Sequence, residues 1–527
     1  MSAATKPTEL LFAHAYFLRF DRKLYEAMQP YPPMGTIVAA AVARQAGREV
    51  ALFDAMLAHD ERAFEAALVA HKPRLVVLYE DNFNYLSKMC LLRMREAALV
   101  MLAAARRHGV RAWVCGSDAS DHPAPYLDAG AELVLVGEGD DTLADLLARG
   151  WDKDPVDADV AATLAGLCFR RGGELVRTPR RATIKAMDAL PWPAWDLCDL
   201  DHYRRIWKER HGRFSLNLVS TRGCPYHCNW CAKPIWGQRY AMHSPEQAAV
   251  LATHLRETFG AEHLWWMDDI FGLKKGWVGA FGEAMRQRGG TLPFKALSRA
   301  DLLVRPGEAD AFADAGAEVV WMGAESGSQT VLDAMDKGTK VEEIEEATRL
   351  LHGRGVEVAY FLQFGYPGET RADIEATRAM LRRCKPDDIG ISVSYPLPGT
   401  RFHDRVADQL GVKQHWIDSS DLDMLYEGPF PTAFYRHLHR VVHMDYKSRR
   451  TLWRLRGQTP RSHRPSPREL ARAAVDSALL PIAEARLDHL AALPHQGVRA
   501  TGATMDFDAA ATPSAPDGSA QAPGASA

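Results

Sequence analysis

Cysteine is scarce in this chain, with eight residues in 527, too few for a disulfide scaffold. No run of about 18 uninterrupted apolar residues occurs, so no integral membrane segment is expected. The N-terminus lacks the basic, apolar and small-residue order of a secretory signal, which predicts a cytoplasmic protein. The formal net charge of -3 gives no general attraction to nucleic acid, and none is expected as a partner.

The order of apolar segments predicts an α/β protein of roughly three domains, at about 150 residues each. From residue 1 to 150, short apolar runs such as LVVLYE and ELVLVGEG alternate with amphipathic stretches. This βαβα order predicts a Rossmann-like, doubly wound parallel sheet, whose ligands bind beyond the carboxyl ends of its strands. Gly116 and Gly137 follow two of these strands, where a backbone could approach a flat or phosphorylated ligand. Plain turns are the alternative.

The rest of the chain divides into four further segments. Residues 151–210 combine prolines with aromatics, which is typical of a packed connector. Residues 211–420 contain six strand-like runs separated by helices, which predicts a partial (β/α)6 barrel of the TIM type with its reactive groups at the carboxyl ends of the strands. Residues 421–500 are expected to be mainly helical. Residues 501–527, rich in Ala, Gly, Pro and Ser, are predicted to be disordered.

Three of the cysteines lie within eight residues, in the segment STRGCPYHCNWCAKPIWG. Cys224, Cys228 and Cys231 form a C-x3-C-x2-C pattern, and a cubane with only three thiolate ligands keeps one iron open for a substrate or cofactor. Structural zinc with His227 as fourth ligand is an alternative, but Cys228 beside it would then have to point the opposite way. A thioredoxin-like pair of Cys228 and Cys231 would leave Cys224 idle.

The cysteine pattern resembles the signature of the radical S-adenosylmethionine (SAM) superfamily, which has an aromatic residue before the last cysteine, here Trp230. The resemblance implies a [4Fe-4S] cluster whose open iron chelates the amino and carboxylate groups of SAM. It also implies that an electron passed through the cluster cleaves SAM to a 5'-deoxyadenosyl radical, which takes hydrogen from unactivated carbon. A reductant such as flavodoxin or ferredoxin is the implied protein partner.

Other segments resemble the cofactor pocket of this family. MDDIF ends the second barrel strand, where family members carry an acidic residue facing the methionine ammonium, so Asp268 and Asp269 are candidates. A helix cap would explain one of them equally well. MGAESGSQTVLDAMDKGT is similar to the G-x-E-S-G segment followed by L-x-x-M-x-K-G. The similarity implies that Glu325 and Ser326 line the pocket, with Glu325 suited to ribose hydroxyls.

Two further matches complete the predicted SAM site. Arg299 in LSRADLL fits the family pattern, as does the GYPGET stretch that begins at Gly365. The resemblance makes this stretch compatible with backbone contacts near adenine, and a simple turn is the alternative.

A Rossmann-like half followed by a radical SAM barrel resembles the cobalamin-binding subgroup of the superfamily. Segments that carry this resemblance include PYPPMGTIVAAAVARQAGREVALFDA and the junction LPWPAWDLCDL. The subgroup's D-x-H-x-x-G motif is missing, because Asp54 is followed by Ala55 and Met56 while His59 lies outside the spacing. The resemblance therefore implies cobalamin without a histidine lower ligand, with Gly116 and Gly137 as candidate contacts. Loss of the corrin is the alternative.

The resemblance implies a cobalamin-dependent methyltransferase that acts on an unactivated carbon of a small or lipid-like molecule. An oxidative ring closure like that of a porphyrin ester, or a rearrangement, is the second hypothesis. A non-catalytic metal-binding or electron-transfer module is the third, and the open coordination site argues against it. The predicted substrate pocket joins the barrel mouth to the C-terminal segment, with four candidate aromatics: Tyr395, Tyr426, Phe430 and Tyr435. Packing in the core is the alternative, since aromatic residues there are more often core than contacts.

Overall fold

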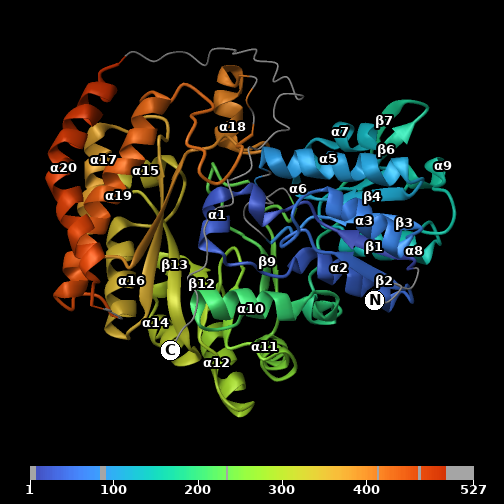
Figure 1. The fold of residues 1–527 in the computed structure, drawn as a ribbon, viewed down its shortest axis with the longest axis horizontal. Helices are drawn as coiled ribbons and strands as arrows, with labels where there is room; N and C mark the ends of the chain where they lie inside the picture. Colours follow the sequence, from blue (N-terminus) through green and yellow to red (C-terminus); the bar gives the residue numbers. More distant parts are fainter. Residues whose placement is uncertain are drawn as a thin grey trace, which may run out of the picture.

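The computed structural model describes residues 8–83, 89, 91–232, 235–411, 413, 415–460 and 464–493. Two α/β units lie side by side, and a pair of long C-terminal helices covers the outer side of the second unit (Figure 1). The predicted tail at 501–527 lies outside the described residues. No helix in the described part of the chain combines the length and the apolarity needed to cross a membrane.

The N-terminal unit is built on a sheet with the strand order β2-β1-β3-β4-β5-β6-β7. Its first five strands are parallel, as predicted. They are β1 (Leu10–Ala13), β2 (Val50–Phe53), β3 (Leu75–Tyr79), β4 (Arg111–Cys115) and β5 (Leu133–Leu135). The connecting helices include α1 (Arg22–Ala27), α2 (Met34–Gln45), α3 (Arg62–His71), α5 (Leu92–Arg107), α6 (Ser117–Asp121), α7 (Pro123–Ala129) and α8 (Asp140–Ala148).

Helices cover both faces of this sheet because alternate residues of each strand point to opposite sides. Leu10 and Phe12 of β1 pack into the core that contains α2 and α8. Leu11 and Ala13 belong to the opposite core, with α3 and α5. The strands are therefore apolar throughout, which is the pattern of a doubly wound sheet.

The N-terminal sheet extends further along the chain than the sequence indicates. Residues 167–177 lie in the segment expected to be an irregular connector, but they form the hairpin β6 (Leu167–Arg171) and β7 (Glu174–Arg177). This hairpin adds two antiparallel strands beside β5. Its strands are short and charged at their ends, RRGGELVR, so the hydrophobic pattern is weak. The helices α9 (Ala158–Ala161) and α10 (Leu200–His211) flank it in the chain.

The second unit contains a six-stranded sheet in the order β15-β14-β13-β12-β11-β8, all parallel. Its strands are β8 (Ser215–Leu218), β11 (His263–Trp266), β12 (Phe294–Ser298), β13 (Ala317–Glu325), β14 (Glu357–Phe364) and β15 (Asp388–Val393). Since β8 and β15 are the two edges and do not pair, the barrel is open, as predicted. A small hairpin of β9 (Thr221–Gly223) and β10 (Tyr240–Met242) follows β8.

Helices cover the outer face of the barrel sheet: α11 (Pro245–Phe259), α12 (Trp277–Gln287), α13 (Ala300–Leu303), α14 (Glu308–Ala315), α15 (Gln329–Ala334), α16 (Val341–Gly353) and α17 (Arg371–Cys384). The short helix α18 (Arg401–Val406) follows β15 and contacts the cysteine loop through Phe402 N–H. Val320 and Met322 of β13 and Tyr360 of β14 are buried in the core shared with these helices. By the period of two, their neighbours Trp321 and Phe361 point to the inner side of the barrel.

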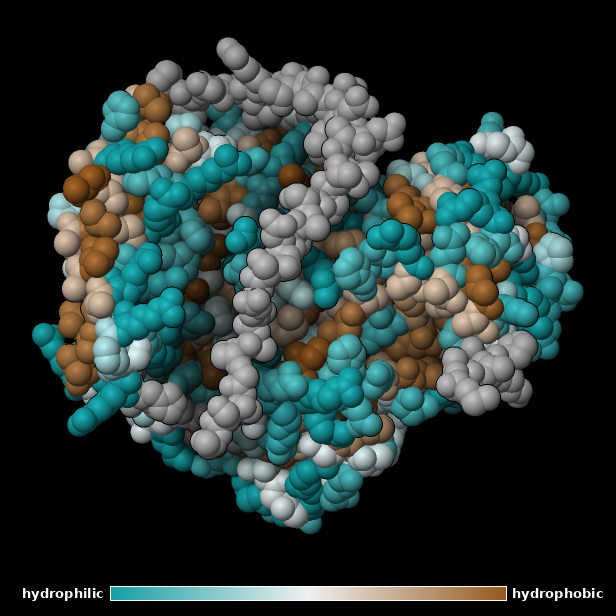
Figure 2. All heavy atoms as spheres, viewed as in Figure 1, coloured by the Kyte–Doolittle hydropathy of each residue, from teal (hydrophilic) through white to brown (hydrophobic). Residues whose placement is uncertain are grey.

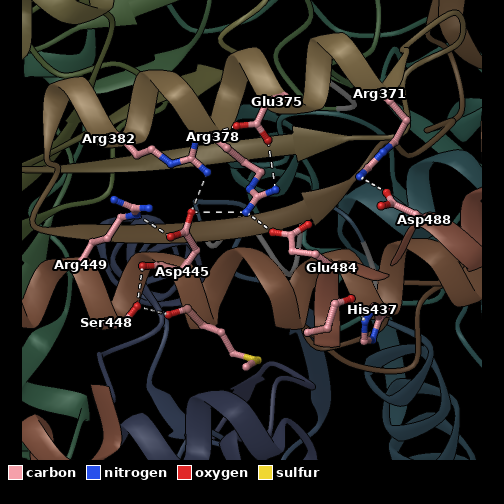
Figure 3. Close-up of polar contacts among 12 residues, drawn as sticks. Arg371, Glu375, Arg378, Arg382, His437, Asp445, Ser448, Arg449, Glu484 and Asp488 are labelled. Carbon is pink, nitrogen blue, oxygen red and sulfur yellow. Dashed lines mark hydrogen bonds and ion pairs between the residues drawn. The ribbon is translucent and has the colours of Figure 1, made fainter. Parts of the chain in front are cut away.

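The C-terminal region is helical, as predicted, and packs against the barrel through a buried ion-pair network. The helices α19 (Thr432–Leu455) and α20 (Pro467–Ala491) lie against each other and beside α17 (Figure 3). Arg378 of α17 is 5% exposed and pairs with Asp445 of α19 and Glu484 of α20. Arg382 also pairs with Asp445. One guanidinium thus ties three helices together.

We predict that Arg378→Met destabilises the protein by about 3 kcal/mol, because it leaves the carboxylates of Asp445 and Glu484 with one cation fewer in a buried setting. The measurement is urea unfolding followed by circular dichroism. Arg371→Met is the matched control on the same helix, since Arg371 pairs with the exposed Asp488, and a surface pair contributes less than about 1 kcal/mol. Equal losses in the two variants would contradict the prediction.

Candidate active site

The cysteine loop leaves the barrel directly after β8 and β9, at the carboxyl end of the first strand. Gly223 precedes Cys224 with φ of 80°, a left-handed conformation. A Cβ atom there would lie 2.2 Å from the carbonyl oxygen of Arg239. Only glycine therefore allows this turn. Cys224, Cys228 and Cys231 are all partly exposed at the loop surface, and three thiols on one short loop are a donor set that suits a cubane.

Asn229, between the second and third cysteines, fastens the loop to the barrel. Its backbone N–H donates to the carbonyl of Met335 at 3.0 Å, and its side-chain Nδ2 donates to the carbonyl of Ala334 at 2.8 Å. Its Oδ1 accepts from the hydroxyl of Tyr366 at 2.7 Å. Its carbonyl accepts from Phe402 N–H. These bonds hold the loop rigidly against the end of α15, although the loop has no regular secondary structure of its own.

Arg299 lies against the cysteine loop. Its Nη1 is 4.0 Å from the sulfur of Cys228, and its guanidinium stacks on the ring of Tyr226 at 3.6 Å. Burial alone would lower the pKa of Arg299, but Asp301, Tyr226 and Cys228 outweigh burial and raise it. A fixed positive charge beside sulfur favours thiolate ligands. The structure therefore places Arg299 next to the candidate cluster rather than at a distance from it.

Glu325 and Lys337 form a second charged group at the same end of the barrel. Glu325 ends β13 with φ of 56°, a strained conformation for a residue with a side chain, and Lys337 Nζ contacts its Oε1 at 2.8 Å. Lys337 also lies 5.9 Å from the ring centre of Trp230. Burial acts to lower the pKa of Lys337, but Glu325 and Cys228 raise it. A buried cation thus lies close to the cysteine loop.

Ser326 links the end of β13 to α17. Its Oγ lies 3.1 Å from Oγ1 of Thr377 and accepts from Ser328 N–H at 3.1 Å. Both contacts are internal to the barrel. The predicted role of Ser326 in the SAM pocket stays a prediction.

Gly365 follows β14 with φ of 84°. Its N–H donates to Glu369 at 2.7 Å, and its carbonyl accepts from the hydroxyl of Tyr426. Burial raises the pKa of Glu369 to about 8. The stretch from Gly365 is therefore a packed turn whose N–H and carbonyl are bonded within the chain, and a role beside adenine stays a prediction.

The two adjacent aspartates after β11 have different environments. Asp268 is 1% exposed and accepts from the backbone N–H groups of Ser220 and Thr221 at 2.7 Å each, and from Ser220 Oγ at 2.6 Å. Burial raises its pKa to about 7, against these bonds. Asp269 is partly exposed. Asp268 thus anchors the start of the cysteine loop, and contact of Asp269 with a ligand ammonium stays a prediction.

A buried ion pair joins the cysteine loop to the N-terminal sheet. Nη1 of Arg222, two residues before Cys224, contacts Glu138 at 2.6 Å and Asp140 at 2.7 Å. All three side chains are at most 5% exposed. Burial raises the pKa of Glu138, and Arg222 opposes this. The carboxyl edge of the N-terminal sheet is therefore fixed directly against the loop that bears the cysteines.

Acidic residues at that carboxyl edge accept hydrogen bonds from the neighbouring backbone. Glu80 after β3 accepts from Ala15 N–H, and burial raises its pKa to about 7. Asp81 accepts from Gly35 N–H at 2.9 Å. Gly116 leaves room for the side chain of Glu80, since a Cβ atom would lie 3.0 Å from its Cγ. Gly137 has φ of 80°. These contacts explain both glycines within the chain, and their contact with a corrin stays a prediction.

The histidine nearest to the missing motif stands in the segment between β2 and α3. His59 is exposed and contacts the carboxylate of Asp60 at 3.0 Å. Asp54 instead binds His14 at 3.0 Å and the hydroxyl of Tyr203 at 2.6 Å. The absence of a histidine lower ligand stays a prediction.

The four aromatics expected to line a substrate pocket are packed within the chain. Tyr395 donates to the carbonyl of Asp421, and Tyr426 bonds to Gly365. Tyr435 is 2% exposed, and Phe430 stacks on Phe434 at 4.3 Å. They build the junction between the barrel and the C-terminal helices.

Three residues around the cysteine loop have roles that the sequence does not reveal: Arg222, Asn229 and Lys337. Lys337 stands within the L-x-x-M-x-K-G segment, so the sequence shows its motif but does not show that it pairs with Glu325. Arg222 and Asn229 carry no pattern of their own, because their partners are 82 or more residues away in the chain.

Known proteins resemble this chain in sequence over the barrel. Residues 218–381 match the sequence profile of the Radical SAM superfamily. An uncharacterised methyltransferase of Pyrococcus horikoshii is 27% identical over 304 residues, 57% of this chain and 62% of that protein. The anaerobic magnesium-protoporphyrin IX monomethyl ester cyclase of Cereibacter sphaeroides is 26% identical over 55% of this chain and 46% of the cyclase. The chain thus spans about half to three-fifths of these relatives.

Solved structures share the fold over both units. The radical SAM methyltransferase TsrM of Kitasatospora setae, solved with cobalamin and a [4Fe-4S] cluster, matches with a TM-score of 0.62 and 19% identity over 76% of this chain and 75% of TsrM. The cobalamin-dependent radical SAM enzyme OxsB, solved with aqua-cobalamin and SAM, matches with a TM-score of 0.65 and 16% identity over 92% of this chain and 72% of OxsB.

The barrel, its cysteine loop and the matched profile define a radical SAM domain, which implies a [4Fe-4S] cluster and SAM. With the N-terminal sheet joined to this domain, the fold of the chain is shared with the solved cobalamin-dependent radical SAM enzymes.

We predict that Asp268→Asn and Asp269→Asn separate the two roles. Asp268→Asn removes a carboxylate that binds two backbone N–H groups at the start of the cysteine loop, which destabilises the loop by about 1 to 3 kcal/mol. Because the loop is then held less firmly, we expect a lower iron content after anaerobic reconstitution. Asp269→Asn keeps the iron content and weakens SAM binding in equilibrium dialysis. A full iron complement in Asp268→Asn, with unchanged SAM affinity in Asp269→Asn, would refute this division.

We predict that Arg222→Met lowers the free energy of unfolding by about 3 to 5 kcal/mol at pH 8, because Glu138 and Asp140 stay buried without their cation. A buried carboxylate without a cation has a higher pKa in the folded state than in the unfolded state. The variant is therefore more stable at low pH, where the carboxylates are protonated, and loses stability as the pH rises. The deficit in urea unfolding should therefore be smaller at pH 5.5. Arg44→Met, which removes the exposed pair with Asp196, is the control. A deficit independent of pH would count against this account.

Proposed function

We propose that this protein is a cobalamin-dependent radical SAM methyltransferase that acts on an unactivated carbon of a small or lipid-like molecule. The observation that carries the proposal is the Arg222 pair, which holds the cysteine loop against the carboxyl edge of the N-terminal sheet. A ligand bound at that edge would face the same space as one bound at the barrel mouth. The names of TsrM and of the Pyrococcus relative support methyl transfer.

The proposed ligands of the cluster are Cys224, Cys228 and Cys231. Trp230, which packs against the main hydrophobic core, is the proposed aromatic neighbour of the cofactor. When bound, the cluster supplies the electron that cleaves SAM. Arg299 and Lys337 stabilise negative charge at the loop, and Asp269 and Glu325 are the proposed contacts to the methionine ammonium and the ribose. The reductant is proposed to be a flavodoxin or ferredoxin type of carrier.

Anaerobic reconstitution tests the radical SAM assignment of these residues. The wild-type chain should take up about four iron and four sulfide ions per chain and release 5'-deoxyadenosine when reduced with SAM. Cys228→Ala should abolish that release. Cys384→Ala is the control, because Cys384 lies on α17, a helix of the outer face. Zinc binding with intact SAM in the wild-type chain would overturn the proposal.

Cobalamin dependence and the type of reaction need separate measurements. Titration with hydroxocobalamin, followed by its visible spectrum, should show one corrin per chain, and no binding would remove the methyl-transfer proposal. The cyclase name of the Cereibacter relative favours ring closure as the second candidate. Methyl transfer predicts S-adenosylhomocysteine together with 5'-deoxyadenosine, whereas ring closure predicts 5'-deoxyadenosine alone.

A further inference from the structure

The inner face of the barrel carries an aromatic surface in place of a filled core. Phe361 lies in the middle of β14, with a strand on each side, yet 39% of its surface is exposed. Trp321 of the neighbouring strand stacks on it, with 4.6 Å between ring centres and 29° between ring planes. A large apolar residue at the centre of a parallel sheet is normally covered, so this surface is left open to a ligand.

Gly390 makes the surface flat. It pairs with Phe361 across β15 and β14. A Cβ atom on Gly390 would lie 3.2 Å from Phe361 and 3.5 Å from Trp321. Both rings thus lie over the backbone of Gly390, and a larger side chain there would push them into the lumen. Figure 2 shows apolar residues in the hollow between the barrel and the N-terminal unit.

Deeper on the same inner face lies Lys295, a lysine that has no carboxylate partner among the residues that the structure describes. Lys295 of β12 is adjacent in register to Trp265 of β11, and its Nζ is 3.2 Å from the centre of the Trp265 ring. Its hydrogen bond goes to the amide oxygen of Gln29 at 2.9 Å. Burial, with the like charge of Arg213, lowers the pKa of Lys295 to about 7. An incoming carboxylate would supply the missing counter-charge.

The strand direction gives the length of the site. Lys295 is the second residue of β12, and Arg299, beside Cys228, directly follows the end of this strand. At about 3.3 Å per residue, the four steps between them span about 13 Å. Trp321 pairs with Leu297, halfway between. A ligand held by Lys295 and lying on the aromatic surface would therefore present its far end to the cysteine loop.

We propose that the substrate is a planar, unsaturated or aromatic carboxylate, held by the Lys295 ammonium and the faces of Trp321 and Phe361, and that the reacting carbon lies at the end remote from the carboxylate. This inference names the substrate class of the function proposed above and rests on it. The binding step itself needs neither the cluster nor reductant, so it can be tested separately.

The test uses the full chain and isothermal titration with three probes: 2-naphthoate, the uncharged 2-naphthalenemethanol, and the saturated decalin-2-carboxylate. The wild-type chain should bind 2-naphthoate at least about tenfold more tightly than either of the others. Lys295→Met should abolish the preference for the acid over the alcohol, and Lys295→Arg should keep it. Phe361→Leu should abolish the preference for the planar acid over the saturated one.

Lys153→Met, at an exposed lysine of the N-terminal unit, is the matched control and should change nothing. Equal affinities for acid and alcohol in the wild-type chain, or an acid preference that survives in Lys295→Met, would overturn the proposal. Release of 5'-deoxyadenosine is measured in parallel. Binding as expected without this release would refute the proposed function and leave the binding site standing, whereas normal release with no probe preference would refute only the substrate class.

Discussion

The arrangement of the whole molecule depends on one buried ion pair between its two α/β units. Arg222 belongs to the strand that leads into the cysteine loop, and its partners Glu138 and Asp140 stand at the carboxyl edge of the other sheet. Burying a guanidinium is unfavourable unless it is paired with a carboxylate. Separating the two sheet edges would therefore cost free energy, because it would leave Arg222 and its partners unpaired. The space between them, where both sets of strands end, is therefore fixed in shape.

Around that pair, the cysteine loop is held by contacts to residues that are themselves rigid. Asp268 binds the backbone at the start of the loop, and Asn229 binds the carbonyl of the last residue of α15. Arg299 and Lys337 add positive charge near Cys228. Hydrogen bonds and fixed charges of this kind set the geometry of metal ligands before the metal arrives. The loop can thus be irregular and still well defined.

The fold can be predicted from the sequence wherever the pattern of apolar residues within a short segment is clear. The doubly wound parallel sheet, the open six-stranded barrel and the C-terminal helices follow from the spacing of apolar residues, which burial on one or two faces imposes. The hairpin over 167–177 was missed because its strands are short and charged at the ends. The sequence alone does not decide whether Tyr395 and Tyr435 pack in a core or line a pocket, because aromatic residues occur in both settings, and the structure packs both rings within the chain.

The sequence by itself determined the chemistry, because three cysteines at C-x3-C-x2-C with an aromatic before the last are confined to one loop and need no distant partner to be recognised. Only the tertiary structure decided which of two adjacent aspartates is buried, which arginine joins the two sheets and which aromatic rings stay open. These properties depend on contacts between residues that lie tens to hundreds of positions apart in the chain. Such contacts produce no repeating pattern in a single sequence, so they cannot be predicted from it.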